Sequence, residues 1–336
     1  MKAMVLRRPA PIAGGPLRME ERRMPSPKKG ELLVRVAYCG VCRTDLHVVE
    51  GELRKLRPSV VPGHEIVGKV AALGHGARGF RVGDTVGVPW LYGTCGKCRY
   101  CKRGEENLCA KKEFTGYSRD GGYAEYVLSD CRYTFKIPGK GDLRSLPPLM
   151  CAGIVGYRAF KLARPSSGKR IGMLGFGASA HLTLQLARKL GYSVVVFSGN
   201  PKHRGLAKRL GAGAVHSYDI SPGKIKGGLL DSAIVFAPSG KLISYAMELI
   251  RPGGKVVAAD IYVEGPIVLD YQRHLFGEKT LTSVEANTRE DALEYLGLAS
   301  KLGIRAVTTE YCLKDANVAL NDLKGGKISG AVVLKP

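Results

Sequence analysis

The segment from Cys39 to Glu65 combines side chains that bind metals with side chains that move protons. It contains two candidate zinc ligands, Cys42 and His64, which are 22 residues apart. Zinc prefers cysteine sulfur and histidine nitrogen, and a catalytic zinc keeps three protein ligands and one open position. The third ligand has to come from elsewhere, and Cys151 in PLMCAG is the candidate. Taken singly, each could be a buried thiol or a surface histidine, but a second cysteine cluster favours metal binding.

That second cluster contains Cys95, Cys98, Cys101 and Cys109, with the spacing C-x2-C-x2-C-x7-C. Four thiolates on one turn-rich segment can close a tetrahedron around zinc, which leaves no open position and is typical of a structural site. An iron–sulfur cluster is the alternative, because ferredoxin motifs also begin with C-x2-C-x2-C. Those motifs have a shorter last gap and a proline after the fourth cysteine, where this chain has Ala110. We therefore predict structural zinc.

A glycine-rich turn in the second half of the chain predicts a dinucleotide site. Gly175, Gly177 and Ala180 form G-x-G-x-x-A after the buried strand pattern RIGML. An amphipathic helix pattern over 178–191 and a second strand pattern, YSVVVFS, follow. In such a βαβ unit the glycines let the backbone approach the pyrophosphate, and the helix N-terminus faces it.

The end of the second strand indicates which nicotinamide cofactor binds. Folds that select NAD usually place an acidic residue about 20 residues past the glycines, where it binds the ribose 2′-hydroxyl. This chain has Ser198 there, with Lys202 and Arg204 following, and no acidic residue between Gly191 and Val215. A serine hydroxyl with nearby cations can bind a 2′-phosphate by charge-assisted hydrogen bonds. We predict NADP, with NAD as the alternative if the basic residues are only the polar start of a helix.

Length and composition limit the classes of protein to consider. The 336 residues predict about two domains, and 45% hydrophobic content is typical of a globular protein. We find no apolar run of about 18 residues and no apolar signal core, so we expect no transmembrane helix and a cytoplasmic location. Six of the nine cysteines are at positions suited to zinc. The others, Cys39, Cys131 and Cys312, are expected to pack as thiols in a reducing compartment.

The net charge of +23 is large enough to attract phosphate groups, so nucleic acid has to be considered as a partner. The lysines and arginines are scattered along the chain and form no basic tail. This distribution favours a general solvated surface. We expect no nucleic-acid partner and no membrane partner.

Short strand patterns separated by turn signals fill most of roughly the first 150 residues, which is typical of a barrel-like β domain. Two helical patterns occur there: 42–51, with Cys42 near its start, and 143–164, with Cys151 at the helix entry. From about residue 170 strands and helices alternate, which predicts a doubly wound parallel sheet. After about Leu281 the patterns are helix, strand, helix and a closing strand.

The motifs GVCRTDLH, PGHEIVG, the four-cysteine segment and CAGIVGYRAF occur in this order in the zinc-dependent alcohol dehydrogenases of the medium-chain dehydrogenase/reductase superfamily. The chain resembles this family nearly end to end. The resemblance implies an α/β protein with a GroES-like β-barrel catalytic domain at 1–151 and 284–336, a structural zinc lobe at 95–109, and a Rossmann domain at 152–283. It implies hydride transfer between an alcohol or aldehyde and a nicotinamide cofactor, with two zinc ions per chain. We expect a homodimer or homotetramer.

The resemblance also implies roles around the catalytic zinc. In the family, a Ser or Thr two residues after the zinc cysteine bonds the substrate oxygen, and a histidine five residues after that cysteine passes the proton on. These are Thr44 and His47 here. Asp45 is the implied hydrogen-bond partner of His64, and Glu65 lies beside the metal.

Two further positions match the family and two depart from it. Arg43 matches a residue that contacts the cofactor pyrophosphate, and Trp90 matches an aromatic that narrows the substrate pocket around small or flat side chains. Val155 stands where relatives often carry a threonine against the nicotinamide. Gly330 and Ala331 stand where some relatives carry a pyrophosphate-binding arginine. These two departures affect residues expected to bind the cofactor, and they leave the candidate metal ligands unchanged.

Other functions remain as alternatives. A polyol or sugar dehydrogenase of the same fold often replaces the third zinc cysteine with a carboxylate, so Cys151 argues against it. A zinc-free quinone reductase lacks the metal ligands that are present here. A zinc-dependent nucleic-acid-binding protein is the remote alternative, suggested by the charge and the four-cysteine segment.

Overall fold

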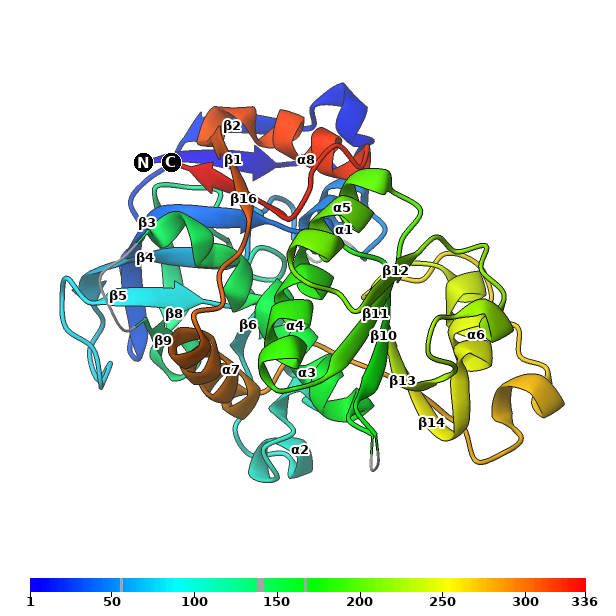
Figure 1. Cartoon of the computed structure of the whole chain (residues 1–336). Coiled ribbons are helices and arrows are strands. Elements are labelled where there is room, and N and C mark those ends of the chain that lie inside the picture. The colour runs from blue at the N-terminus through cyan, green and yellow to red at the C-terminus, as the bar shows by residue number, and fades with distance from the viewer. Residues whose placement is uncertain (55–56, 138–141, 166–167) are drawn as a thin grey trace. The chain divides into compact units, whose positions relative to one another are not determined.

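The computed structural model describes residues 1–54, 57–137, 142–165 and 168–336, which divide into two compact units (Figure 1). The first unit comprises Met1–Ala152, Ala286–Ser300 and Arg305–Pro336. The second unit comprises Gly153–Glu285 and Lys301–Ile304. The first unit therefore contains both ends of the chain.

The main sheet of the first unit has, within the described residues, seven strands in the order β16-β17-β3-β4-β5-β9, with β8 also paired to β3. The strands are β3 (Glu31–Val41), β4 (Glu65–Leu73), β5 (Thr85–Val88), β8 (Tyr126–Asp130), β9 (Phe135–Lys136), β16 (Thr308–Cys312) and β17 (Ala331–Lys335). The long β3, rich in Val and Leu, pairs with β4, β8 and the C-terminal β17. Its end at Val41 leads directly to Cys42, so this sheet positions the first metal-ligand candidate.

Smaller elements complete the first unit. Two two-stranded sheets pair β1 (Lys2–Leu6) with β2 (Leu17–Glu21) and β6 (Leu91–Gly93) with β7 (Glu113–Phe114). The helices are α1 (Arg43–Glu50), α2 (Arg99–Lys102), α7 (Arg289–Leu302) and α8 (Ala316–Lys324). Helix α1 buries Leu46 and Val49 in the same core that holds Ala319 and Leu320 of α8. The C-terminal helix therefore helps to hold the helix that follows Cys42.

The second unit contains a parallel sheet that has, in the described part of the chain, six strands in the order β12-β11-β10-β13-β14-β15. The strands are β10 (Arg170–Leu174), β11 (Ser193–Phe197), β12 (Ala214–His216), β13 (Leu230–Val235), β14 (Ile250–Ala258) and β15 (Thr280–Ser283). The helices are α3 (Ala152–Ala163), α4 (Ala178–Lys189), α5 (Pro201–Arg209) and α6 (Gly240–Leu249). This strand order is that of the Rossmann fold, in which dinucleotides bind where the order reverses, beside the first strand.

The predicted fold class, a GroES-like domain with a Rossmann domain, is confirmed, and the helix predicted at 42–51 is α1. The glycine-punctuated segment 60–74, in which a strand pair or one bent strand is expected, contains one strand, β4, with two register shifts against β3. Four strands, β2, β6, β7 and β15, were not predicted, and β6 and β7 have only three and two residues. Strand β2 is mostly polar and exposed, and β15 is a four-residue edge strand, so neither has a hydrophobic pattern. In the described residues no helix is both long enough and apolar enough to cross a bilayer.

Candidate metal centres and cofactor site

Cys42 is placed by the junction between β3 and α1. It is the extended residue before the helix, with φ −109° and ψ 158°. Its backbone N–H donates to the Asp45 carboxylate at 2.9 Å, and the Asp45 N–H donates to the Cys42 carbonyl at 3.1 Å. These two bonds close the first turn of the helix and hold Cys42 and Asp45 in a fixed relation.

Asp45 organises the buried surroundings of His64. Besides the Cys42 N–H, its carboxylate accepts hydrogen bonds from His64 Nδ1 at 2.8 Å, the Gly63 N–H at 3.1 Å and the Tyr123 hydroxyl at 3.2 Å. Asp45 and His64 are 1% and 0% exposed. Because Nδ1 donates to the carboxylate, the lone pair of His64 is on Nε2.

Four potential ligands lie together at this point. The ligand atoms of Cys42, His64, Glu65 and Cys151 all lie within 4.8 Å of one another. His64 Nε2 is buried and has no hydrogen-bond partner among the described residues. Cys151 reaches the cluster from the turn before α3, and the N–H of the next residue, Ala152, donates to Glu65 at 3.3 Å. A buried imidazole lone pair beside two thiols fits a zinc ion with a cysteine–histidine–cysteine ligand set.

The charges of this cluster also favour a cation. The pKa of Cys42 is lowered well below its usual range, mainly by a hydrogen bond with Cys151. Burial opposes this decrease in the pKa, and His64 adds to it. The hydrogen bond with Cys42 raises the pKa of Cys151, and burial raises it further. Burial opposes protonation of His64, but Asp45 and Cys42 together raise its pKa well above normal. Burial and the Cys42 charge raise the pKa of Glu65. A bound cation would relieve this crowding of acidic groups.

Thr44 and His47 lie on α1 beside this cluster. The Thr44 hydroxyl is 3.8 Å from Cys42 Sγ. His47 is buried, and its Nδ1 contacts the carboxylate of Glu52, whose side chain is 38% exposed. Gly51, with φ 82°, ends the helix and turns the chain back, so that the Glu52 N–H bonds the His47 carbonyl at 3.0 Å. Glu52 was not predicted. The usable signal is Gly51, because a glycine that ends a helix can turn the residue after it back toward a histidine in the last turn of that helix.

The other candidates of the first unit are placed as follows. Arg43 is the first residue of α1 and is half-buried. Trp90 is buried and packs edge-to-face on His64, with ring centroids 4.8 Å apart. Gly330 has φ 97°, and a Cβ there would lie 2.4 Å from the Val307 carbonyl oxygen, so an arginine does not fit at this position.

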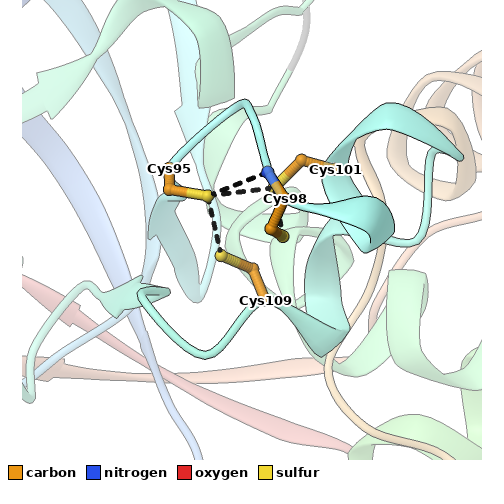
Figure 2. A group of neighbouring side chains, drawn as sticks. All are labelled: Cys95, Cys98, Cys101 and Cys109. Carbon is orange, nitrogen blue, oxygen red and sulfur yellow. Dashed lines mark hydrogen bonds between the residues drawn. The ribbon is translucent and has the colours of Figure 1, made fainter.

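Figure 2 shows the second cysteine cluster, in which Cys95, Cys98, Cys101 and Cys109 lie together on one lobe. Their sulfur atoms are all within 4.8 Å of one another. The N–H of Cys98 donates to Cys95 Sγ at 3.4 Å. Backbone N–H groups of Lys97 and Cys98 lower the pKa of Cys95 to about 6, whereas burial raises that of Cys101 to about 11. Four sulfur ligands at this spacing fit a closed tetrahedral zinc site.

The lobe is attached to the rest of the first unit through Glu106, which is 2% exposed. Its carboxylate accepts hydrogen bonds from the backbone N–H and the Nε of Arg289, at 3.0 and 2.9 Å, at the start of α7. The Arg289 guanidinium also lies over the Tyr133 ring, 5.3 Å from its centroid. Tyr133 in turn shares a 2.5 Å hydrogen bond with Thr94, next to Cys95. The contact between Glu106 and Arg289, which lie far apart in sequence, was not predicted.

The glycine-rich turn lies in the second unit, between β10 and α4. Gly175 has φ 88°, and a Cβ there would meet the Ala237 backbone nitrogen at 2.9 Å, so a side chain does not fit. A Cβ on Gly177, the residue before α4, would meet nothing within 4 Å, so the backbone is open on that side. Ala180 is fully buried in the first turn of the helix. The turn therefore has the open backbone and helix N-terminus that a pyrophosphate needs.

The end of β11 brings the predicted cofactor-selecting residues together. Ser198 is 2% exposed and its hydroxyl accepts the Asn200 N–H at 3.3 Å. Arg204 Nη1 donates to the carbonyls of Ser198 and Gly199 at 2.7 and 2.9 Å, so one guanidinium nitrogen holds the loop itself. Lys202 is in the first turn of α5, where its N–H bonds the Asn200 side chain at 2.9 Å.

Tyr218, after β12, also reaches this loop and was not predicted. Its ring lies 3.5 Å from the position of a Cβ on Gly199. Burial raises the pKa of Tyr218, while hydrogen bonds from the Gly199 and Gly175 backbone and the Ser198 side chain oppose that rise. The phenol therefore lies between the glycine-rich turn and the end of the second strand.

Both halves of the chain match known families. Residues 28–139 match the family described as "Alcohol dehydrogenase GroES-like domain", and residues 180–301 match "Zinc-binding dehydrogenase". The chain is 44% identical over 339 residues to the Mycobacterium tuberculosis protein named "Probable alcohol dehydrogenase AdhA", covering 99% of this chain and 97% of that protein.

Solved structures of alcohol dehydrogenases have the same fold. The enzyme from Aeropyrum pernix is 28% identical, with a TM-score of 0.90 over 100% of both chains. The cobalt- and zinc-bound enzyme from Pyrobaculum aerophilum is 26% identical, with a TM-score of 0.90 over 100% of this chain and 99% of that one. The chain therefore belongs to the zinc-type alcohol dehydrogenases of the medium-chain dehydrogenase/reductase superfamily.

Proposed function

We propose that Cys42, His64 and Cys151 hold the catalytic zinc of this alcohol dehydrogenase, and that the enzyme uses NADP(H). The observation that carries the metal assignment is the buried, unpartnered Nε2 of His64 within 4.8 Å of both thiols. When bound, zinc supplies the Lewis acidity that makes the alcohol proton easier to lose. Asp45 fixes the tautomer and orientation of His64. Glu65, held by the Ala152 N–H, is a carboxylate that can assist ligand exchange.

Thr44, His47 and Glu52 form the proposed path for the proton. The Thr44 hydroxyl, beside Cys42, is placed to accept it from the substrate oxygen. His47 is buried one turn further along α1, and Glu52 connects its Nδ1 with solvent. His47→Gln should lower turnover by roughly ten- to a hundred-fold near neutral pH, with a smaller loss at higher pH, where hydroxide replaces the missing base. An unchanged pH–rate profile would remove His47 from the path.

Trp90 and Arg43 are proposed contacts of the two reactants. Trp90 packs on His64, so its ring limits the space beside the metal and favours alcohols with small or flat side chains. Arg43 supplies a cation at the start of α1 for the cofactor pyrophosphate.

The preference for NADP(H) rests on the residues at the end of β11. Ser198 replaces the acid that binds the 2′-hydroxyl of NAD, and Arg204, Lys202 and Tyr218 lie around the same loop. Hydroxyl and cationic donors can bind a 2′-phosphate, whereas a carboxylate would repel it. Gly175, Gly177 and Ala180 would receive the pyrophosphate.

A spectrophotometric panel at about 340 nm tests substrate and cofactor together. Short, long and aromatic alcohols and aldehydes are each assayed with both nicotinamide cofactors. We expect a higher kcat/KM with NADP⁺ than with NAD⁺, and Ser198→Asp should move the ratio toward NAD⁺ because it adds a 2′-hydroxyl acceptor and a repulsive charge. A clear preference of the unmodified enzyme for NAD⁺ would overturn the cofactor assignment.

The remaining assignments follow from the same features. The lobe of Cys95, Cys98, Cys101 and Cys109 holds a second, structural zinc, which makes two per chain. None of the nine cysteines, all of which lie in the described residues, forms a disulfide, which supports a reducing, cytoplasmic location. We keep a homodimer or homotetramer as the proposed assembly. Cys151 favours simple alcohols over polyols as substrates, because polyol dehydrogenases of this fold often have a carboxylate in its place.

A further inference from the structure

The chain has one tryptophan, Trp90, and it is the residue that packs against the metal-ligand candidate His64. The two rings meet edge-to-face, with centroids 4.8 Å apart and planes at 69°. Trp90 is only 5% exposed. Any shift of its ring therefore changes the space beside the metal cluster.

Two aromatic residues hold the Trp90 ring. Phe114 stacks on it with centroids 4.6 Å apart and planes at 19°. Tyr117 also stacks on it, with centroids 5.9 Å apart and planes at 18°. In addition, the Thr115 N–H donates to the Trp90 carbonyl at 2.9 Å, which fixes the backbone of the same segment to Trp90. The segment from Phe114 to Tyr117 thus supports both the ring and the main chain of Trp90.

Tyr117 differs from Phe114 because it is tethered at its outer end. Its hydroxyl donates to the Arg54 carbonyl at 2.5 Å. Nearby, Asp120 accepts Arg57 Nη1 at 2.9 Å and the Val61 N–H at 3.1 Å. The turn that carries Tyr117 is therefore fastened to three residues that lie between α1 and β4, namely Arg54, Arg57 and Val61. Tyr117 joins that segment to the stack on Trp90.

We propose that Tyr117 is a positioning residue that sets the size of alcohol the enzyme prefers, by holding Trp90 beside His64. This inference rests on the proposed function, in which Trp90 lines the substrate pocket. An aromatic ring that loses one stacking neighbour gains room to rotate or shift, because packed interiors keep side chains in place through close contact. Loss of Tyr117 therefore enlarges the space beside the metal cluster without touching a metal ligand.

Two variants separate the parts of this role. Tyr117→Leu removes both the stacked ring and the tether, and Tyr117→Phe removes the tether alone. Tyr311→Leu is the matched control, because Tyr311 is also half-buried in the first unit and also donates its hydroxyl to one acceptor, Asp322, at 2.9 Å. The readouts are the kcat/KM ratio of benzyl alcohol to ethanol, and the emission maximum and acrylamide quenching of the single tryptophan.

Tyr117→Leu should raise the benzyl alcohol to ethanol ratio by roughly tenfold, the low end of the effect of one methylene group in a hydrophobic pocket. Its tryptophan emission should move to longer wavelength and become more easily quenched. Tyr117→Phe should change both readouts in the same direction by less, and Tyr311→Leu should match the unmodified enzyme.

Trp90→Ala distinguishes failure of this inference from failure of the proposed pocket. If Trp90→Ala leaves the ratio unchanged, the pocket assignment falls and the role of Tyr117 falls with it. If Trp90→Ala shifts the ratio while Tyr117→Leu keeps the unmodified ratio and emission, the role of Tyr117 alone is overturned. A uniform loss with both alcohols in Tyr117→Leu, at unchanged emission, would also contradict it.

Discussion

The two cysteine clusters of the first unit are built in opposite ways. The lobe cluster takes all four candidate ligands from one segment, Cys95 to Cys109, and three of the four cysteines are only half-buried. The buried cluster takes Cys42, His64 and Cys151 from the end of β3, the residue before β4 and the turn before α3. One cluster is local in sequence, and the other needs the whole sheet to be assembled.

This difference predicts which cluster depends on a bound metal for its structure. The lobe has only short elements, such as the four-residue α2, and few buried apolar side chains, so we expect a metal to hold it together. The buried cluster is held by β3, β4 and the four hydrogen bonds that Asp45 accepts. Removing a ligand there should therefore damage chemistry more than folding.

Cys42→Ala should reduce turnover to background while the melting temperature stays close to that of the unmodified enzyme. The variant removes a proposed metal ligand from a site whose backbone is fixed by other bonds. Cys39→Ala is the control, because Cys39 is a buried cysteine close to Cys42 in the chain that lies outside the cluster. Turnover and thermal unfolding are measured on both at equal zinc supply. Near-normal turnover in Cys42→Ala would end the assignment.

Cys98→Ser should lower the melting temperature by roughly 5–10 °C and remove about one zinc per chain, because metal binding in the lobe is coupled to its folding. Turnover measured well below the melting temperature should fall much less than in Cys42→Ala. Cys312→Ser, at an exposed thiol outside both clusters, should change neither quantity. An unchanged melting temperature and zinc content in Cys98→Ser would contradict a structural role.

Asp45→Asn should lower zinc affinity or turnover by about ten- to a hundred-fold, the usual cost of losing a carboxylate that orients a histidine ligand. Asparagine keeps the shape but loses the charge that accepts four hydrogen bonds. Asp84→Asn, at a surface ion pair with Lys136, serves as the control. Equal zinc affinity and turnover in Asp45→Asn and the control would show that Asp45 does not support the site.

Glu106→Gln should lower the stability of the first unit by about 1–2 kcal/mol with zinc content unchanged, because it weakens the charged hydrogen bonds between the lobe and Arg289. Calorimetry and metal analysis measure the two quantities. Glu105→Gln, next to it, should have a smaller effect, since Glu105 pairs with an exposed arginine two residues earlier. A larger loss in Glu105→Gln would reverse this part of the account.

The parts of the molecule that could be predicted from sequence are those with local patterns. The lobe cysteines are within 15 positions of one another, and Gly175 and Gly177 lie between a strand and a helix whose periodicities are clear. The junction of β3 and α1 was predicted for the same reason. Buried strands and capped helices carry their own signals.

The unpredicted features depend on contacts between distant segments. Glu106 and Arg289 are 183 residues apart, and the Tyr123 hydroxyl reaches Asp45 across 78 residues. Tyr218 approaches Ser198 only because β12 lies beside β11 in the sheet. Glu52 is closer in sequence to His47, but its contact depends on the left-handed turn at Gly51. A single sequence contains no periodicity that marks such pairs.

We infer that the buried cluster has an open metal position and that the lobe cluster has none. Cobalt(II) in place of zinc tests it, because its visible absorption depends on ligand number and geometry. We predict about two cobalt ions per chain, and addition of trifluoroethanol should change the absorption of one of them only. That change should vanish in Cys151→Ala and persist in Cys109→Ser. A spectrum that does not respond to the alcohol, or one that still responds in Cys151→Ala, would contradict the account.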